Sequence, residues 1–367
     1  MLYIPIGLII LLATSGIAYL LFSKFNIMFT LVIGVIMSAI IGIIITIDFD
    51  SQTSDIEMWS GTITNVEHKE EWDEWIPPKT RTYTTTVNGK PVTHTTVTPG
   101  YWQHHNATNT ITTSDRGRIS VHKVPDGRKL TDSFVNSTEE LASYYPIGSP
   151  TASTHSYTNK IKASYSIFKH KEINLDDYPD LPKYPTQVNS KYSIDRLIGD
   201  FGADIDVLNE QLSKLNSTLN DTNNPNNINN VKSYKQVNII MVNFGDKDIN
   251  YGYALQDYWR NGAKNDLVIT FGVDSNNKPT WSYVFSWTDV EILKTDIREY
   301  IMNLENINNF SAAIEDVGNM VEEKFERKEF VEFDYIQISV GRFATICIWI
   351  IIILACGVVF IVIKEME

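Results

Sequence analysis

The stretch VNIIMVNFGDKDINYGYALQDYWRNGAKNDLVITFGVD, residues 237 to 274, decides the fold of the C-terminal half of this chain. Two of its runs, VNIIMVNF and DLVITFGVD, have the length and the apolar, β-branched composition of buried strands. Between them, YGYALQDYWRNG has the pattern of a short helix that ends at a glycine. Alternation of strand and helix predicts an α/β domain here.

The flanking segments continue the alternation. Before the stretch, apolar residues recur at spacings of three and four, which predicts an amphipathic helix. They are Ile198, Phe201, Ile205, Leu208, Leu212, Leu215 and Leu219. The stripe suits either a coiled coil with another chain or packing on a sheet, and we favour the sheet. After the stretch, TWSYVFSW predicts a strand, TDVEILKTDIREYIMNL and residues 309 to 327 predict helices, and FVEFDYIQISV predicts a last strand.

This order of elements resembles the TPM-domain family over residues 190 to 330, through VNIIMVNF, YALQDYWRNGAKNDLVITFGVD and FSAAIEDVGNMVEEKF. The resemblance implies a membrane-anchored α/β/α module, here 190 to 340, outside the cytoplasm and beside a C-terminal membrane helix. Phosphatase activity and calcium binding are attributed to some members of that family. In this chain TWSYVFSW replaces the family's glycine-rich stretch with its acidic residue, so no catalytic residue is carried over.

Three aspartates near residue 200 have two interpretations. Asp200, Asp204 and Asp206 offer oxygen ligands of the kind that Ca²⁺ prefers. On a helix, positions 200 and 204 share a face but position 206 does not, so we favour a solvated acidic face. We expect no metal or cofactor site.

The N-terminal half of the polar region has a different composition. Residues 55 to 175 are rich in Thr, Ser, Tyr and Trp, and short alternating runs such as SGTITNVEHKE, GRISVHKV and IKASYSIFKH predict an antiparallel β-rich module. The segment 176 to 189 begins with DDYPDLPKYP, whose prolines exclude a regular helix or a central strand. We interpret this segment as a linker between the β-rich module and the α/β module.

A threonine-rich hairpin is predicted at residues 79 to 98. Asn88-Gly89 favours a type I′ turn, which pairs Val87 with Lys90, Thr85 with Val92 and Tyr83 with His94. Both faces are rich in threonine, so neither requires burial. Pro91 cannot donate to a ladder and favours an edge. The hairpin therefore predicts a protruding arm.

Aromatic residues frame this arm in WIPP and PGYW. In the interpretation that we favour, Trp72, Trp75 and Trp102 anchor the arm to its own domain; in the other they form a contact surface for a partner. The candidate partner-binding residues are Trp72, Trp75, Tyr83, Asn88, Gly89, Tyr101 and Trp102. The nearby histidines do not predict a zinc site, because adjacent His104 and His105 point to opposite faces of a strand.

Three apolar runs, 2 to 22, 27 to 47 and 343 to 363, are each long enough for a transmembrane helix, which needs about 20 residues. Lys24 lies in the loop between the first two runs, and Lys364 follows the third. The positive-inside rule favours the cytoplasmic side for both lysines. We therefore expect a multi-pass cell-membrane protein whose large domain lies outside the cytoplasm.

Composition narrows the function classes. The 367-residue chain has a net charge of −13, so an acidic central region repels nucleic-acid phosphates. Its two cysteines, Cys347 and Cys356, both lie in the last apolar run, which excludes a thiol nucleophile elsewhere. Phosphate-binding loops, G-x-S-x-G and H-E-x-x-H motifs are absent from the sequence.

These observations predict a membrane-anchored binding or assembly protein of bacterial or phage type, without a predicted catalytic residue. Its expected partners are the lipid bilayer and either another protein or further copies of the chain. The alternative is a membrane-anchored, metal-dependent phosphatase-like hydrolase.

Overall fold

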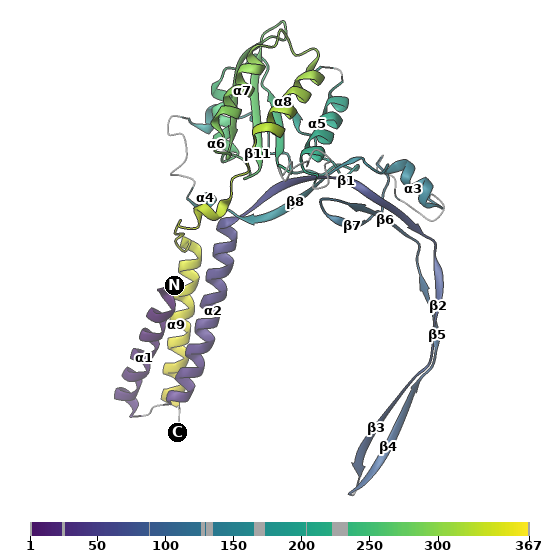
Figure 1. Cartoon of the computed structure of the whole chain (residues 1–367). Coiled ribbons are helices and arrows are strands. Elements are labelled where there is room, and N and C mark those ends of the chain that lie inside the picture. Colours follow the sequence, from purple (N-terminus) through teal and green to yellow (C-terminus); the bar gives the residue numbers. More distant parts are fainter. Residues whose placement is uncertain are drawn as a thin grey trace. The chain divides into compact units, whose positions relative to one another are not determined.

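A computed structural model describes residues 2–23, 26–87, 89–125, 129, 135–164, 173–202, 204–221 and 234–365 (Figure 1). The chain divides into two compact units. The first comprises Met1–Ile56, Ser156–Glu172 and Glu329–Glu367, and the second comprises Glu57–His155 and Ile173–Lys328. The long apolar helices belong to the first unit, and most of the strands belong to the second.

Three helices of the first unit are long and apolar enough to cross a membrane. They are α1 (Tyr3–Phe22), α2 (Ile27–Thr53) and α9 (Arg342–Glu365). A glycine lets them approach closely, because a Cβ on Gly7 would lie 3.2 Å from side-chain atoms of both Ile352 and Met37. The three predicted apolar spans coincide with these helices, and α2 continues beyond its apolar run.

Hydrogen bonds join the end of α2 to the start of α9. The N–H of Gly341 donates to Asp48 Oδ2 at 2.9 Å, and Gln52 Nε2 donates to the carbonyl of Ser339 at 3.2 Å. A carboxylate beside the first turn of α9 is favourable, because a helix N-terminus carries partial positive charge. The chain therefore leaves α2 and enters α9 at the same end of the helix bundle.

A four-stranded sheet with the order β7-β6-β1-β8 comes after α2 in the chain. Its strands are β1 (Ser54–Lys69), β6 (Thr108–Thr113), β7 (Gly117–Ser120) and β8 (Pro150–Thr158), and the β1–β6 and β6–β7 pairs are antiparallel. Ile63, Val66 and Ile111 form its apolar core together with Leu141 of α3 (Thr138–Tyr144). The antiparallel β structure predicted for this half of the chain is thus present.

A second four-stranded sheet has the order β12-β11-β10-β9. Strand β10 (Asn238–Asn243) is parallel to both β9 (Leu197–Ile198) and β11 (Asp266–Val273). Strand β12 (Pro279–Ser286) is antiparallel to β11. Every residue of β10 and β11 is buried, as their continuous apolar runs predict for strands covered on both faces.

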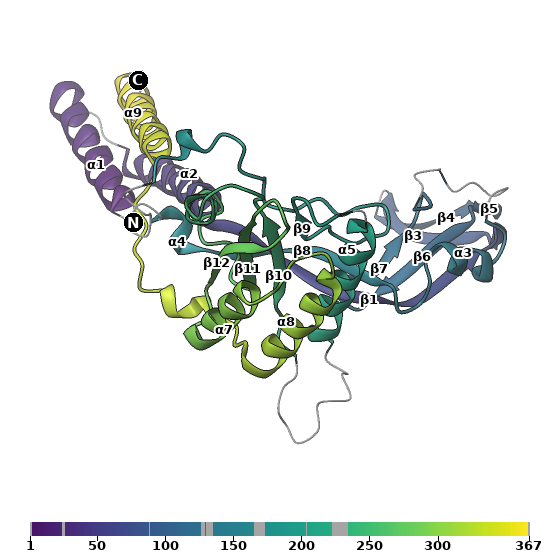
Figure 2. The same cartoon turned by 90° about the horizontal axis from the view of Figure 1, so that it is seen from above.

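Helices cover both faces of this second sheet (Figure 2). On one face the apolar core is shared with α5 (Ile205–Leu219), α7 (Glu291–Met302) and α8 (Phe310–Lys324). On the other, α6 (Asn250–Tyr258) packs through Leu255, next to Trp259, Leu181 and Tyr184. The mixed α/β architecture predicted from the sequence is confirmed.

Three predicted elements differ from the structure. The helix predicted from residue 198 begins at Ile205, because Ile198 belongs to β9 and two glycines with positive φ, Gly199 and Gly202, separate the strand from the helix. FVEFDYIQISV forms the short 3₁₀ helix η3 (Phe330–Phe333) and no strand. IKASYSIFKH begins with helix α4 (Lys160–Ala163), and its residues from 165 onward lie outside the described residues.

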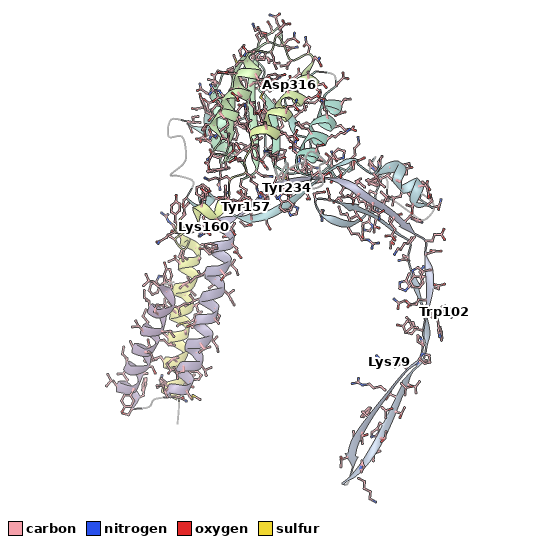
Figure 3. All side chains as sticks on the ribbon, viewed as in Figure 1. Lys79, Trp102, Tyr157, Lys160, Tyr234 and Asp316 are labelled. Carbon is pink, nitrogen blue, oxygen red and sulfur yellow. The ribbon has the colours of Figure 1, made fainter. Side chains whose placement is uncertain are left out.

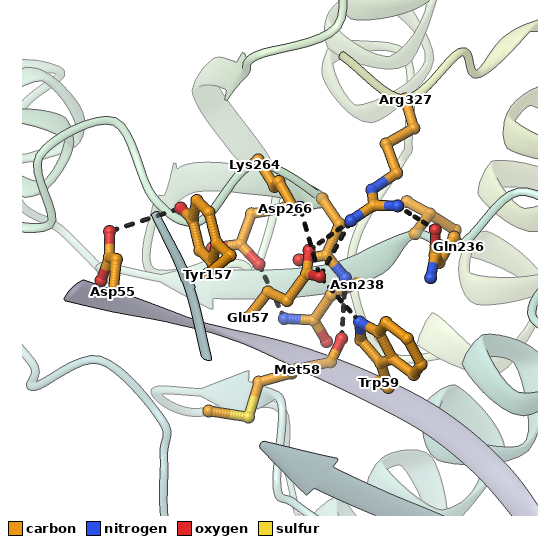
Figure 4. Close-up of polar contacts among 12 residues, drawn as sticks. Asp55, Glu57, Met58, Trp59, Tyr157, Gln236, Asn238, Lys264, Asp266 and Arg327 are labelled. Carbon is orange, nitrogen blue, oxygen red and sulfur yellow. Dashed lines mark hydrogen bonds and ion pairs between the residues drawn. The ribbon is translucent and has the colours of Figure 1, made fainter. Parts of the chain in front are cut away.

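A buried ion cluster attaches β1 to the α/β sheet (Figure 4). Glu57 of β1 is only 2% exposed, and its two carboxylate oxygens accept hydrogen bonds from Arg327 Nη2 at 2.9 and 2.7 Å. Lys264 Nζ lies 3.6 Å from Glu57 Oε1, and the indole N–H of Trp59 donates to the same oxygen at 2.9 Å. The Glu57 carboxylate is therefore desolvated, but it is matched by two cations.

A third cation, Arg196, is fully buried and adds to the attachment. Arg196 donates from Nε to Asn238 Oδ1 at 2.6 Å and from Nη2 to Ser60 Oγ of β1 at 2.7 Å. Burial lowers the pKa of Arg196 to about 10, so the side chain stays cationic at neutral pH. Asn238 in turn donates to Asp266 Oδ1 at 2.8 Å, which places a carboxylate near the guanidinium.

This cluster predicts a large effect from a small substitution. Glu57→Gln removes the charge that neutralises Arg327 and Lys264, so we expect a loss of about 3 to 5 kcal/mol in the free energy of unfolding. Chemical denaturation of the detergent-solubilised chain measures it. The control is Glu67→Gln, because Glu67 pairs with Arg118 at the surface; there we expect a loss of about 1 kcal/mol or less. Equal losses in the two variants would contradict this role for Glu57.

Candidate partner-binding surface

The predicted partner-binding residues that the structure describes lie on two successive two-stranded ribbons, with Gly89 in the turn of the second. In the first, β2 (Trp72–Ile76) pairs antiparallel with β5 (Tyr101–His105), with Trp72 opposite His105 and Trp75 opposite Trp102. In the second, β3 (Lys79–Val87) pairs with β4 (Lys90–Thr98). We call the first the aromatic ribbon and the second the arm. Figure 3 shows the aromatic ribbon at Trp102 and the start of the arm at Lys79.

Alternation of side chains gives the aromatic ribbon two distinct faces. On the first face the rings of Trp72 and His105 stack, with centroids 4.3 Å apart and planes 10° apart. His105 Nε2 also lies 3.0 Å from Glu74 Oε2. An indole, an imidazole and a carboxylate therefore hold one another in fixed positions at the protein surface.

The second face has a similar composition but contains a pair of indoles. The rings of Trp75 and Trp102 lie 5.3 Å apart, and the ring of Trp75 also covers Gly100, where a Cβ would approach Trp75 Cζ2 to 2.6 Å. His104 Nδ1 lies 2.8 Å from Asp73 Oδ1, and Nε2 of the same ring lies 3.9 Å from Glu71 Oε2. Each face thus combines tryptophan with a histidine–carboxylate pair.

The aromatic side chains are exposed. The exposed fractions are 53% for Trp72, 47% for Trp75, 54% for Tyr101 and 67% for Trp102. The favoured interpretation, in which the three tryptophans anchor the arm to its own domain, is therefore wrong: the indoles contact cross-strand neighbours, and about half or more of each residue faces solvent. Such exposure leaves large, rigid aromatic surfaces available for contact.

The arm has the register that an Asn-Gly turn at its tip predicts. Thr85 lies opposite Val92 and Tyr83 opposite His94, and Gly89 has a φ of +76°. Asn88 itself lies outside the described residues. Tyr83 is 51% exposed and stacks on His94 with ring centroids 5.1 Å apart. All nine residues of β4 are exposed, so this strand contributes nothing to a core.

The acidic candidates do not converge. Asp200 and Asp204 line one cavity of about 440 Å³ beside α5, whereas Asp206 lines a different cavity of about 580 Å³. Asp200 Oδ1 accepts the N–H of Gly202 at 2.9 Å, which fixes a turn before the helix. Within the described part of the chain, no three His, Cys, Asp or Glu side chains are grouped so that they could hold a metal ion.

Sequence reasoning missed the polar half of the aromatic ribbon. The residues that it did not assign to the surface are Glu71, Asp73, Glu74, His104 and His105. His105 stacks on Trp72, and the two histidines pair with the three carboxylates. The register of β2 with β5 is the signal that identifies them. That register continues the pairing of the arm past two interruptions of equal length, residues 77–78 and 99–100, so extending the predicted arm pairing would have identified it.

Comparisons with known proteins found no similarity. No family model matches the sequence, no curated protein is significantly similar to it, and no solved structure is significantly similar to it. The resemblance of residues 190 to 330 to the TPM-domain family therefore stays a prediction.

The exposure of the indoles makes their contribution to stability testable. Trp102→Ala removes a side chain that is mostly in solvent, so we expect a loss of about 1 kcal/mol or less in the free energy of unfolding. The matched control is Trp259→Ala. Trp259 is 7% exposed, packs on the α/β sheet and donates its indole N–H to Pro182, so its loss should be about 3 to 5 kcal/mol. Chemical denaturation of both variants checks this, and similar losses would show that Trp102 belongs to a core.

Proposed function

We propose that this chain is a membrane-anchored binding or assembly protein of bacterial or phage type, and that the aromatic ribbon contacts its protein partner. The observation that carries the proposal is the exposure of Trp72, Trp75, Tyr101 and Trp102 on a ribbon with two uncovered faces. Trp and Tyr dominate the energetics of protein interfaces, because each places a large rigid surface in contact at low entropic cost.

Polar side chains beside the indoles support this interpretation. Histidine–carboxylate pairs flank tryptophan on both faces, so a partner meets an apolar centre with hydrogen-bonding groups next to it. Interfaces commonly have this arrangement of an aromatic core and a polar rim. A purely structural ribbon has no need of exposed indoles, since threonine suffices on the neighbouring arm.

We further propose three membrane crossings, with the second unit outside the cytoplasm. Two observations support this topology. The contact of Asp48 with Gly341 makes the chain leave and re-enter the helix bundle at one end. Lys364, in the last turn of α9, lies at the opposite end of that helix, where the positive-inside rule favours the cytoplasm.

A site-specific photo-crosslinker tests the binding proposal. Placed at Trp102 in the chain expressed in its native host, it should give a discrete adduct with a second protein. A crosslinker at Val207, which is equally exposed on α5, should give none. Trp75→Ala should weaken the Trp102 adduct without unfolding the chain. Absence of any adduct at Trp102 in a folded, membrane-inserted chain would overturn the proposal.

Cysteine labelling tests the topology. The native cysteines both lie in α9, so a single Ile147→Cys substitution, at a residue that is 64% exposed, introduces a thiol into the second unit. It should react with a membrane-impermeant maleimide in intact cells. Labelling that appears only after lysis would place the second unit in the cytoplasm.

The alternative function is a metal-dependent phosphatase-like hydrolase, which a separate assay tests. Purified chain would then contain a stoichiometric divalent metal and cleave a generic phosphoester. Retention of that activity after Asp200→Asn and Asp204→Asn would exclude the cavity that these residues line as its site.

A further inference from the structure

The arm is a two-stranded sheet, so each of its strands has one edge outside the ladder. Among the described residues, β3 pairs with β4 and with no third strand. Unpaired strand edges present rows of N–H and C=O groups that readily pair with another chain, and folded proteins usually block them. The two edges of this arm differ in how far they are blocked.

Pro91 identifies the backbone groups that point outward. It lies opposite Thr86 and has no N–H, so Thr86 and Pro91 form a non-hydrogen-bonded pair. Hydrogen-bonded and non-hydrogen-bonded pairs alternate along an antiparallel ladder. The residues whose backbone N–H and C=O groups point away from the ladder are therefore, in β3, Thr80, Thr82, Thr84 and Thr86. In β4 they are Pro91, which offers only its C=O, Thr93, Thr95 and Val97.

Only the β4 edge is blocked. Pro91 removes one of its outward N–H groups and puts a ring in the way of an incoming strand. The β3 edge carries threonine at each outward position, and Lys79 to Thr86 are all exposed. Threonine has high β propensity and no charge at neutral pH, so the outward-pointing positions of β3 do not oppose an added strand.

We propose that the β3 edge pairs antiparallel with β3 of a second copy of this chain, giving a four-stranded sheet β4-β3-β3-β4. The inference rests on the proposed function in that it treats the arm as a contact element. With the two-fold axis at Tyr83, Thr80 hydrogen-bonds to Thr86 of the second copy, and Thr82 to Thr84 of the second copy. Tyr83 then faces Tyr83 of the second copy.

The charges of β3 favour this register and direction. Its cations, Lys79 and Arg81, lie at the start of the strand, and the rest of the strand is uncharged. Antiparallel pairing about Tyr83 puts Arg81 opposite Thr85 of the second copy and separates the four cations into two distant pairs. Parallel pairing would set Lys79 and Arg81 directly against their counterparts, which is unfavourable. An isologous two-fold contact is also the commonest symmetry among oligomers.

A cysteine on the two-fold axis tests the register. In a background of Cys347→Ala and Cys356→Ala, Tyr83→Cys in the full-length membrane-inserted chain should form a disulfide-linked dimer under mild oxidation. Residue 83 would form a non-hydrogen-bonded pair with itself, in which Cα atoms lie about 4.5 Å apart, within the range of disulfides. Thr95→Cys, on the blocked strand, is the control and should stay monomeric. Equal crosslinking of the two variants would overturn the proposed register.

Two proline substitutions separate loss of the edge from loss of the arm. Thr84 and Thr93 form one cross-strand pair, and the backbone N–H groups of both residues point away from the arm's own ladder. Thr84→Pro removes an N–H from the β3 edge, and Thr93→Pro removes the matching N–H from the β4 edge, so both strain the hairpin alike. Only Thr84→Pro should abolish the Tyr83→Cys crosslink. The same loss in both variants, or in neither, would overturn the inference.

The two proposals fail independently. The crosslinked product at position 83 has twice the mass of the chain, whereas the Trp102 adduct contains a different protein. Thr84→Pro should leave the Trp102 adduct unchanged. Loss of the dimer with retention of that adduct would reject self-pairing alone.

Discussion

A buried carboxylate on the first residues of β1 holds the second unit together. Glu57 is matched by Arg327, which follows α8, and by Lys264, which lies in the turn before β11. Both residues are remote from Glu57 along the chain. Arg196 adds a second buried charge that reaches from β9 to Ser60 of the same strand. Charges taken out of water are costly unless they are paired, so these contacts fix where β1 lies on the α/β sheet.

Strand β1 then sets the course of the next segment of the chain. Past the buried contacts it pairs with β6 as far as Lys69, and the chain continues into β2, β3 and the returning strands β4 and β5. Residues 54 to 113 therefore form one long antiparallel hairpin, in which β1, β2 and β3 pair with β6, β5 and β4. Its beginning is constrained by buried charge and by the apolar core under β1, and its far part is constrained by cross-strand contacts alone. The buried residues of this segment lie in β1 and β6, and the exposed indoles lie beyond them.

Those parts of the fold that depend on local pattern could be predicted from the sequence. The apolar runs predicted the three long helices and the strands β10 and β11. A strand that is covered by helices on both faces needs a continuous apolar run. The packing of Leu208, Leu212 and Leu219 against the sheet was also predictable from their spacing. The start of α5 was not, because Ile198 and Phe201 fit the helical spacing by coincidence. The glycines beside them have φ values of +106° and +86°, which no spacing rule detects.

Contacts between distant segments could not be predicted. A glutamate near the start of a strand looks like a solvent-facing residue, and nothing local indicates that Arg327 and Lys264 will enclose it. For the tryptophans, the favoured expectation was contact with their own domain, and the structure leaves them exposed. Their alternation with polar residues fits a ribbon, but burial or exposure depends on whether another element lies above them. A zinc site at His104 and His105 was not predicted, but the carboxylate with which each histidine pairs on its own face of the ribbon could not be identified from local pattern.

The long antiparallel hairpin of residues 54 to 113 has a consequence for how this protein can vary among related chains. Its outgoing and returning strands lengthen in step, so an equal, even number of residues inserted on both sides of the tip keeps every side chain on its face. Such changes leave Glu57, the apolar core and the α/β sheet untouched. The distance from the core to the tip of the arm can therefore change independently of the rest of the fold. Each residue added to both strands lengthens the arm by about 3.4 Å.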